Sequence, residues 1–354
     1  MLDAIILANG AYDSPNGKVA HGLIRGGERF RIHAVVDPQC DGRDAGELLD
    51  GQARNIPAVG SVARAVATAE QAPEWAIVGV APHGGRFTPE LHAAAREALA
   101  AGMHLVSGLH DWAGDDPELA ATAREAGVEI HDLRRPPPVR DLHFWTGAIR
   151  RVRAPRVAVL GMDCAIGKRT TTRLLTLGLH DRGHTSEMIY TGQTGWLQGG
   201  RYGFVLDATP NDYVSGELEQ AIVRCDEEIA PDVILLEGQS GLRNPSGPCG
   251  AEFLLSGGAD TVVLQTDPQR EYFDGMEADG YRLPPVADEI ALIRAYGAET
   301  VAVTLRGDPT DPVVAATRKE LEAELDLPVC CPLHQDLAPV LDAVESRLKK
   351  KAAG

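Results

Sequence analysis

The sequence lacks any long apolar run. None of its hydrophobic stretches approaches the roughly 18 residues that a membrane-spanning helix needs. Its first residues, MLDAIILANGAYDS, lack the basic region of a signal peptide and have the pattern of a buried strand. We therefore expect a soluble protein of the cytoplasm with no membrane partner.

Basic residues are fewer than acidic ones. Lys and Arg number 34 against 51 Asp and Glu, which gives a formal net charge of -17. Proteins that bind nucleic acid irrespective of sequence use a cationic surface, so we expect no nucleic-acid partner. Any recognition of phosphate must therefore be local.

Paired cysteines with metal-ligand spacing are absent as well. The six cysteines form no CxxC pair, and a chain of this length does not need a disulfide framework. We expect reduced thiols, in agreement with a cytoplasmic location.

A chain of 354 residues predicts two domains. In the first half, short apolar runs alternate with helical patterns, as in parallel sheets covered by crossover helices. The run Arg134–Pro138 contains three consecutive prolines, so we place a Rossmann-like domain at 1–140 and a second α/β domain at 141–354. The first domain has an acidic residue, Asp37, at the end of its second strand but no GxGxxG, which favours a scaffold whose ligand is lost or altered.

The second domain begins with the pattern of a phosphate-binding loop. The apolar run Val157–Leu160 precedes GMDCAIGKRTTT, and leucines at helical spacing follow it. In such a loop, backbone N–H groups and the helix N-terminus surround a phosphate, and a lysine adds a mobile cation. The residues predicted to bind the phosphate of a cofactor are Gly161, Cys164, Ala165, Ile166, Gly167, Lys168, Arg169, Thr170 and Thr171.

This loop departs from the common P-loop in two respects. Five residues separate its glycines instead of four, and Arg169 stands where a Ser or Thr hydroxyl normally binds Mg²⁺. The sequence therefore predicts no firm metal site. Thr170 and Glu237 are the candidate ligands if ATP and Mg²⁺ are used.

Further polar residues follow predicted strands. Glu237, Gln239 and Ser240 come directly after the apolar run at 233–236, where a carboxylate can hold a metal or accept a proton. The glycine-bracketed turn at 190–196 presents Gln193 and Thr194, which are suited to a carboxylate or amide substrate, and Gln239 and Ser240 are predicted to bind the substrate with them. Asp207 and Asp212 precede a helical pattern over 215–229 and are candidates for contacts with a metal or an amine, although Asp is also common at helix starts.

Together, the loop and the strand end LLEGQSG resemble those of dethiobiotin synthetase over these patches alone. A resemblance over nearly the whole chain is to the DgcN-like family, in which the loop, the TGQTG turn and the EGQ strand end recur. That family pairs a Rossmann-like domain with a P-loop NTPase-like domain. It is associated with N-acetylation of D-glutamate by acetyl-CoA, and the resemblance implies that activity here.

Two enzymatic hypotheses follow, and a third is non-enzymatic. An acetyltransferase needs a base and oxyanion donors, for which we predict Asp163 or Glu237 as base, and Lys168 with backbone N–H groups as donors. The alternative is an ATP- and Mg²⁺-dependent ligase or kinase that activates a carboxylate. A nucleotide-sensing module is disfavoured, because a sensor does not require so many polar groups at one sheet edge. A homo-oligomer is the default expectation for either enzyme.

Overall fold

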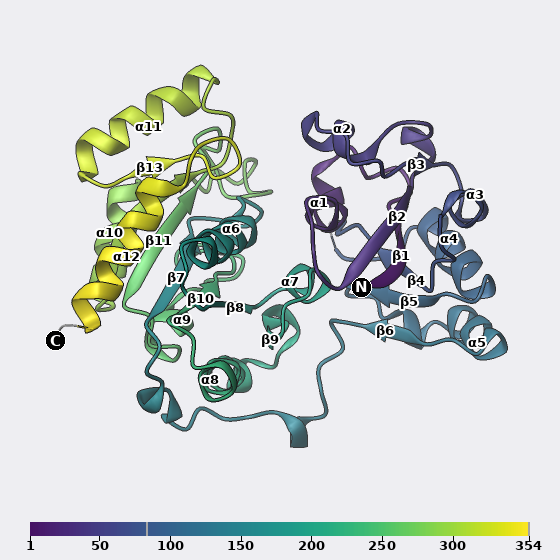
Figure 1. Ribbon diagram of the computed structural model, residues 1–354, viewed down its shortest axis with the longest axis horizontal. Coiled ribbons are helices and arrows are strands. Elements are labelled where there is room, and N and C mark those ends of the chain that lie inside the picture. The colour runs from purple at the N-terminus through teal and green to yellow at the C-terminus, as the bar shows by residue number, and fades with distance from the viewer. Residues whose placement is uncertain (83, 353–354) are drawn as a thin grey trace. The chain divides into compact units, whose positions relative to one another are not determined.

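The computed structural model describes residues 1–82 and 84–352. The chain divides into two compact units. Unit 1 comprises Met1–Pro137 and Gln193–Gly199, and unit 2 comprises Pro138–Gly192 and Gly200–Gly354. Both are α/β structures built on parallel sheets, as the sequence predicted (Figure 1).

Unit 1 contains a six-stranded sheet in the order β3-β2-β1-β4-β5-β6. This order reverses direction between β1 and β4, as in dinucleotide-binding folds. The strands are β1 (Leu2–Leu7), β2 (Phe30–Val36), β3 (Ala58–Val59), β4 (Trp75–Val78), β5 (His104–Ser107) and β6 (Ile130–Asp132). The helices are α1 (Lys18–Ile24), α2 (Ala45–Asp50), α3 (Val62–Thr68), α4 (Pro89–Ala100), α5 (Pro117–Ala126) and α7 (Gln193–Leu197).

Asp37, the acidic residue at the end of β2, serves the backbone of unit 1. It is fully buried, and its two oxygen atoms accept hydrogen bonds from the N–H groups of Tyr12 and Gln39, both at 2.9 Å. In a nicotinamide site this carboxylate would bind a ribose hydroxyl. These two bonds give Asp37 a structural role within unit 1.

Unit 2 contains a seven-stranded sheet in the order β13-β12-β11-β7-β10-β8-β9. Its strands are β7 (Arg156–Gly161), β8 (Ser186–Tyr190), β9 (Tyr202–Gly203), β10 (Val233–Glu237), β11 (Thr261–Thr266), β12 (Glu299–Leu305) and β13 (Val329–Cys330). Its helices are α6 (Lys168–Asp181), α8 (Asn211–Ile229), α9 (Ala251–Leu255), α10 (Val286–Ala295), α11 (Pro312–Leu325) and α12 (Ala338–Ala352).

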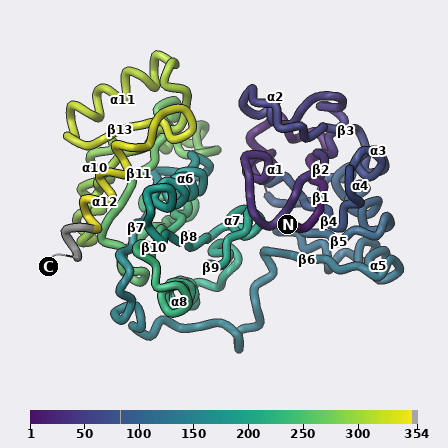
Figure 2. The backbone as a smooth tube through the Cα atoms, viewed as in Figure 1, coloured from purple at the N-terminus to yellow at the C-terminus, as the bar shows by residue number. Residues whose placement is uncertain are grey.

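Alternate residues of the central strand β7 face two separate cores. Val157 and Val159 belong to the core that α6 and α12 complete, and these two helices lie side by side (Figure 2). Ala158 and Leu160 belong to the core formed with α8, α9, α10 and α11. This two-sided burial explains why the strand is a continuous apolar run. It also fixes the end of β7, from which the phosphate-binding loop starts.

Candidate functional site

The predicted loop connects the carboxyl end of β7 to the N-terminus of α6. Two of its residues have left-handed backbone conformations, Ala165 at φ 54° and Gly167 at φ 107°. Such turns allow successive N–H groups to face one anion at a helix N-terminus. Ile166 is buried, whereas Cys164 is half-buried, with its thiol 3.6 Å from the Ser240 hydroxyl. The loop therefore has the backbone geometry of an anion site.

Lys168, the first residue of α6, points back into this loop. Its side chain is 6% exposed, and its ammonium donates a hydrogen bond to the backbone carbonyl of Asp163. Burial lowers the pKa of Lys168 to about 8, although nearby acidic groups partly offset that effect. A cation with little access to water gains strongly from a bound anion.

Asp163 is tied into the structure by four hydrogen bonds. Its carboxylate accepts from the N–H groups of Cys164 and Asp274, at 2.7 and 2.8 Å, and from the Asn244 amide at 2.8 Å. The fourth donor is the Arg270 guanidinium, at 2.6 Å. A fully buried carboxylate with these partners has no position for a substrate proton. This geometry favours Asp163 as a residue that fixes the loop, and its predicted role as the base stays a prediction.

Glu237 lies at the end of β10, the strand next to β7 in the sheet. It is 3% exposed, its carboxylate accepts a hydrogen bond from the Thr191 N–H at 2.9 Å, and its backbone carbonyl accepts one from the Thr191 hydroxyl at 2.6 Å. Burial raises the pKa of the Glu237 carboxyl. The Thr191 N–H and the charges of Arg169 and Lys168 act in the opposite direction. Glu237 is therefore a buried acid beside the cations of the loop.

The hydroxyls that follow Lys168 do not form a magnesium site in the usual way. Thr171 donates to the Gln265 amide oxygen at 2.7 Å, and that oxygen also accepts from Thr304 at 2.6 Å. Thr170 is half-buried, and Arg169 occupies the position of the usual ligand. The side chains present do not fit Mg²⁺ in the ordinary P-loop arrangement.

The residues after Glu237 complete this sheet edge. The Gln239 amide donates to the Thr191 hydroxyl at 3.1 Å, and Ser240 has a left-handed backbone, φ 43°. A Cβ on Gly192 would lie 3.1 Å from the Gln239 amide nitrogen and 3.5 Å from the nearer Glu237 oxygen. The turn thus approaches both side chains as closely as a glycine allows.

Gln193 and Thr194 belong to unit 1. They begin the short helix α7, where the sequence predicted a turn. The Gln193 amide oxygen accepts a hydrogen bond from Arg134 at 2.7 Å, and a Cβ on Gly108 would lie only 1.6 Å from that oxygen. Gln193 is thus fixed within unit 1 by its own contacts.

Asp207 and Asp212 are both exposed. Asp207 lies in the 3-10 turn Leu206–Ala208, and Asp212 lies in the first turn of α8. That position is an ordinary one for Asp, because the helix dipole favours negative charge there. Their predicted role in binding an amine stays a prediction.

Three residues of this site were missed from the sequence: Asn244, Gln265 and Arg270. Gln265 comes near the carboxyl end of β11, and Arg270 follows that strand by four residues. Each of the three residues lies at the end of, or shortly after, an apolar strand that pairs with β7. The sequence shows the apolar strands, but it does not show which of them pair with β7.

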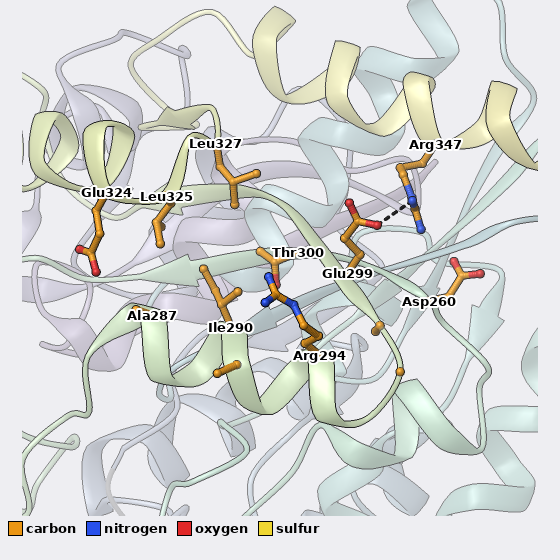
Figure 3. Close-up of a pocket in the computed structure, with 13 residues that line it drawn as sticks. Asp260, Ala287, Ile290, Arg294, Glu299, Thr300, Glu324, Leu325, Leu327 and Arg347 are labelled. Carbon is orange, nitrogen blue, oxygen red and sulfur yellow. Dashed lines mark ion pairs between the residues drawn. The ribbon is translucent and has the colours of Figure 1, made fainter.

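A cavity in unit 2 lies elsewhere. It has a volume of about 690 Å³ and is lined by residues such as Ile290, Arg294 and Thr300. Figure 3 shows the ion pair between Glu299 and Arg347 at its wall, a contact of 2.7 Å. Glu299 and Thr300 begin β12, so the cavity is at the amino edge of the sheet. It contains none of the predicted site residues.

Comparison with known proteins defines the family. The model of the DUF1611 P-loop domain, a domain of unknown function, matches residues 143–341, and its Rossmann-like N-terminal counterpart matches residues 38–136. A crystal structure of a DUF1611 family protein from Anabaena variabilis superimposes with a TM-score of 0.88 and 28% identity. It covers 98% of this chain and 100% of that one.

Two curated relatives carry a functional name. A D-glutamate N-acetyltransferase of Tritonibacter scottomollicae is 30% identical over 279 residues, which are 76% of this chain and 80% of that protein. A D-glutamate N-acetyltransferase of a Pseudoalteromonas species is 30% identical over 201 residues, 56% of this chain and 58% of that protein. The resemblance predicted from the motifs is confirmed, and the chain belongs to the DUF1611 family, with its Rossmann-like and P-loop domains.

Proposed function

We propose that this protein transfers an acetyl group from acetyl-CoA to the amino group of a D-amino acid, and that the acceptor is D-glutamate. The observation that carries the proposal is an anion-binding loop with two adjacent cations, Lys168 and Arg169, in a chain similar to proteins named D-glutamate N-acetyltransferase. The diphosphate of CoA carries two negative charges, which these two side chains balance. Backbone N–H groups of residues 161–167 supply the remaining hydrogen bonds.

The proposal limits what Lys168 does. An ammonium that pairs with the diphosphate of acetyl-CoA has its charge and N–H donors engaged there, so it does not also serve the thioester carbonyl. We therefore assign Lys168 to binding CoA and drop its predicted role as an oxyanion donor. The donors for the tetrahedral intermediate are other groups, at the place where the thioester is held.

Glu237 remains the proposed base among the predicted residues. Its pKa is raised by burial, and a carboxylate with a raised pKa accepts a proton from an ammonium more readily. This role requires the pantetheine arm to turn back along the loop. We propose that Gln239 and Ser240, which follow Glu237, contact the acceptor; the role of Gln193 and Thr194 in binding substrate stays a prediction.

Glu237→Gln distinguishes a base from a structural anchor. If Glu237 removes the proton, kcat falls by roughly a hundredfold or more while the KM for D-glutamate changes little. If Glu237 only holds the turn at Thr191, the variant changes KM and stability and leaves kcat near the wild-type value. Steady-state kinetics over a range of pH, together with urea unfolding of the same variant, separate the two results.

An ATP- and Mg²⁺-dependent ligase or kinase is the second candidate. An acidic residue at the end of the strand beside the loop favours it, because Glu237 occupies the position of a metal-binding carboxylate. The engagement of the Thr171 hydroxyl by Gln265 and the presence of Arg169 disfavour it.

One assay separates these candidates. The full-length protein is incubated with D-glutamate and either acetyl-CoA or ATP with Mg²⁺, and free thiol and ADP are followed. Thiol release that depends on the amino acid supports acetyl transfer, whereas ADP release supports the ligase. Lys168→Ala abolishes either signal, with the exposed Lys319→Ala as the matched control. If neither signal appears with a panel of D- and L-amino acids, both assignments fail.

A further inference from the structure

Arg169 occupies the place of a magnesium ligand. In P-loop enzymes the residue after the lysine supplies a hydroxyl to Mg²⁺, and a carboxylate from a neighbouring strand completes the metal shell. Here the second residue of α6 is Arg169, and the carboxylate of the neighbouring strand β10 is Glu237. The usual oxygen ligand is thus replaced by a side chain that carries its own positive charge.

The neighbouring threonines do not restore the missing ligand. Thr171 donates its hydroxyl to Gln265 on β11, and Thr172 donates to the carbonyl of Lys168 at 2.8 Å. Thr170 is one position later than the usual ligand, which on an α-helix corresponds to a rotation of about 100°. Within the described residues, the start of α6 therefore lacks a hydroxyl in the usual position.

The helical phase of α6 turns Arg169 away from the side that Thr171 faces. Residues two apart on an α-helix are separated by about 200° around its axis, and the charge of Arg169 also lowers the pKa of the buried Glu237 carboxyl. Thr171, two residues further along α6, faces Gln265 on the strand at the other side of β7. The first turn of α6 thus places a cation on the β10 side, where Mg²⁺ is bound in ATP enzymes.

We infer that Arg169 takes the place of Mg²⁺ in this P-loop, so that Lys168 and Arg169 together bind a diphosphate without a metal. The number of charges on the phosphate chain fits. The diphosphate diester of CoA has two negative charges for these two cations, and the separate 3'-phosphate of CoA lies outside this count, whereas the triphosphate chain of a nucleotide concentrates about four charges and calls for a divalent ion. This inference rests on the proposed function and adds that the reaction requires no metal.

Binding of CoA to the full-length protein, measured by calorimetry in EDTA and in excess Mg²⁺, tests the inference. The wild-type dissociation constant is expected to be the same in both buffers. In Arg169→Thr, which restores the common residue, affinity in EDTA falls by about tenfold or more, because one charge-assisted contact is lost. Added Mg²⁺ recovers at least part of this loss in the variant alone. Arg173→Thr, one turn further along α6, is the matched control and keeps the wild-type behaviour.

Other outcomes overturn the inference or the proposed function separately. If the wild-type protein binds CoA only with Mg²⁺, the inferred role of Arg169 is wrong. The same holds if Arg169→Thr binds CoA in EDTA with unchanged affinity. Neither result contradicts the proposed acetyl transfer. If the wild type binds no CoA in either buffer, the proposed function fails. ADP, which also carries a diphosphate, then tests Arg169 in the same two buffers. If Arg169→Thr does not fold, Arg169→Lys keeps the charge and is expected to bind CoA in EDTA.

Discussion

At the scale of single residues, neighbouring side chains of the site have different surroundings. Lys168 and Arg169 are consecutive, yet one points back to the loop carbonyl of Asp163 and the other has its charge near Glu237. The sequence predicts Asp163 as a candidate base because it lies in the loop. In the structure its carboxylate accepts four hydrogen bonds, which favours a structural role.

The lowered pKa of Lys168 predicts how CoA binding depends on pH. Lys168 must be protonated to bind the diphosphate, and its pKa in the free protein is about 8. Affinity is therefore constant below about pH 8 and falls by about tenfold per pH unit above it, because each unit costs about 1.4 kcal/mol of proton uptake. Lys168→Arg keeps its charge and is expected to show a flat profile in titrations across this range. A wild-type profile that is equally flat contradicts the prediction.

Removal of Asp163 is expected to destabilise the protein. In Asp163→Ala the half-buried Arg270 guanidinium loses its 2.6 Å contact but keeps Asp274 and the Cys164 carbonyl, and the free energy of unfolding falls by about 1–3 kcal/mol. Urea denaturation measures this loss, and Asp163→Asn, which retains hydrogen-bonding capacity, shows a smaller one. If Asp163→Asn keeps wild-type stability but loses all activity, the structural role is wrong and Asp163 is the base after all.

At the scale of elements, the strand order brings the site together. β10 and β11 lie on either side of β7, so Glu237, Gln265 and the loop after Gly161 share one sheet edge. The sequence predicted β7, β10 and α6 well, because apolar runs and helical spacing are local signals. It did not single out Gln265, because the pairing of β11 with β7 joins segments about a hundred residues apart.

The first glycine of the loop has a specific packing role. A Cβ on Gly161 would lie 2.6 Å from Cδ of Lys168, so Gly161→Ala displaces the lysine stem. We expect CoA affinity to fall by about tenfold while the free energy of unfolding changes by only about 1 kcal/mol, because a flexible side chain yields. Gly247→Ala, whose Cβ meets nothing within 4 Å, is the control. Unchanged CoA binding by Gly161→Ala in calorimetry would show that the position of Lys168 does not matter.

At the scale of the whole molecule, the order of the two α/β parts was predictable and the path of the chain was not. The segment Gln193–Gly199 leaves unit 2 and joins unit 1, where Leu197 is buried and the Gln198 amide donates to the carbonyls of Gly22 and Gly26 at 2.8 and 2.7 Å. A local pattern of hydrophobic residues does not show in which of the two units a helix of five residues is buried. The homo-oligomeric state and cytoplasmic location stay predictions, and no described helix is long and apolar enough to cross a membrane.

The contribution of α7 predicts the behaviour of the first unit alone. A chain of residues 1–140 lacks Leu197 and Gln198, so its free energy of unfolding is lower by about 2–4 kcal/mol than that of the same chain with 193–199 joined through a flexible linker. Urea denaturation of the two chains measures the difference. Equal stability would show that residues 1–140 form a complete domain without α7.

The most direct test of the account is the identity of the product. The full-length protein is incubated with acetyl-CoA and D-glutamate, and the amino acid is examined by mass spectrometry. The account predicts that D-glutamate gains the mass of one acetyl group on its nitrogen, in EDTA as well as in Mg²⁺, and that Lys168→Ala forms none of this product. Unmodified amino acid with acetyl-CoA, and phosphorylated product or ADP with ATP and Mg²⁺, would contradict it.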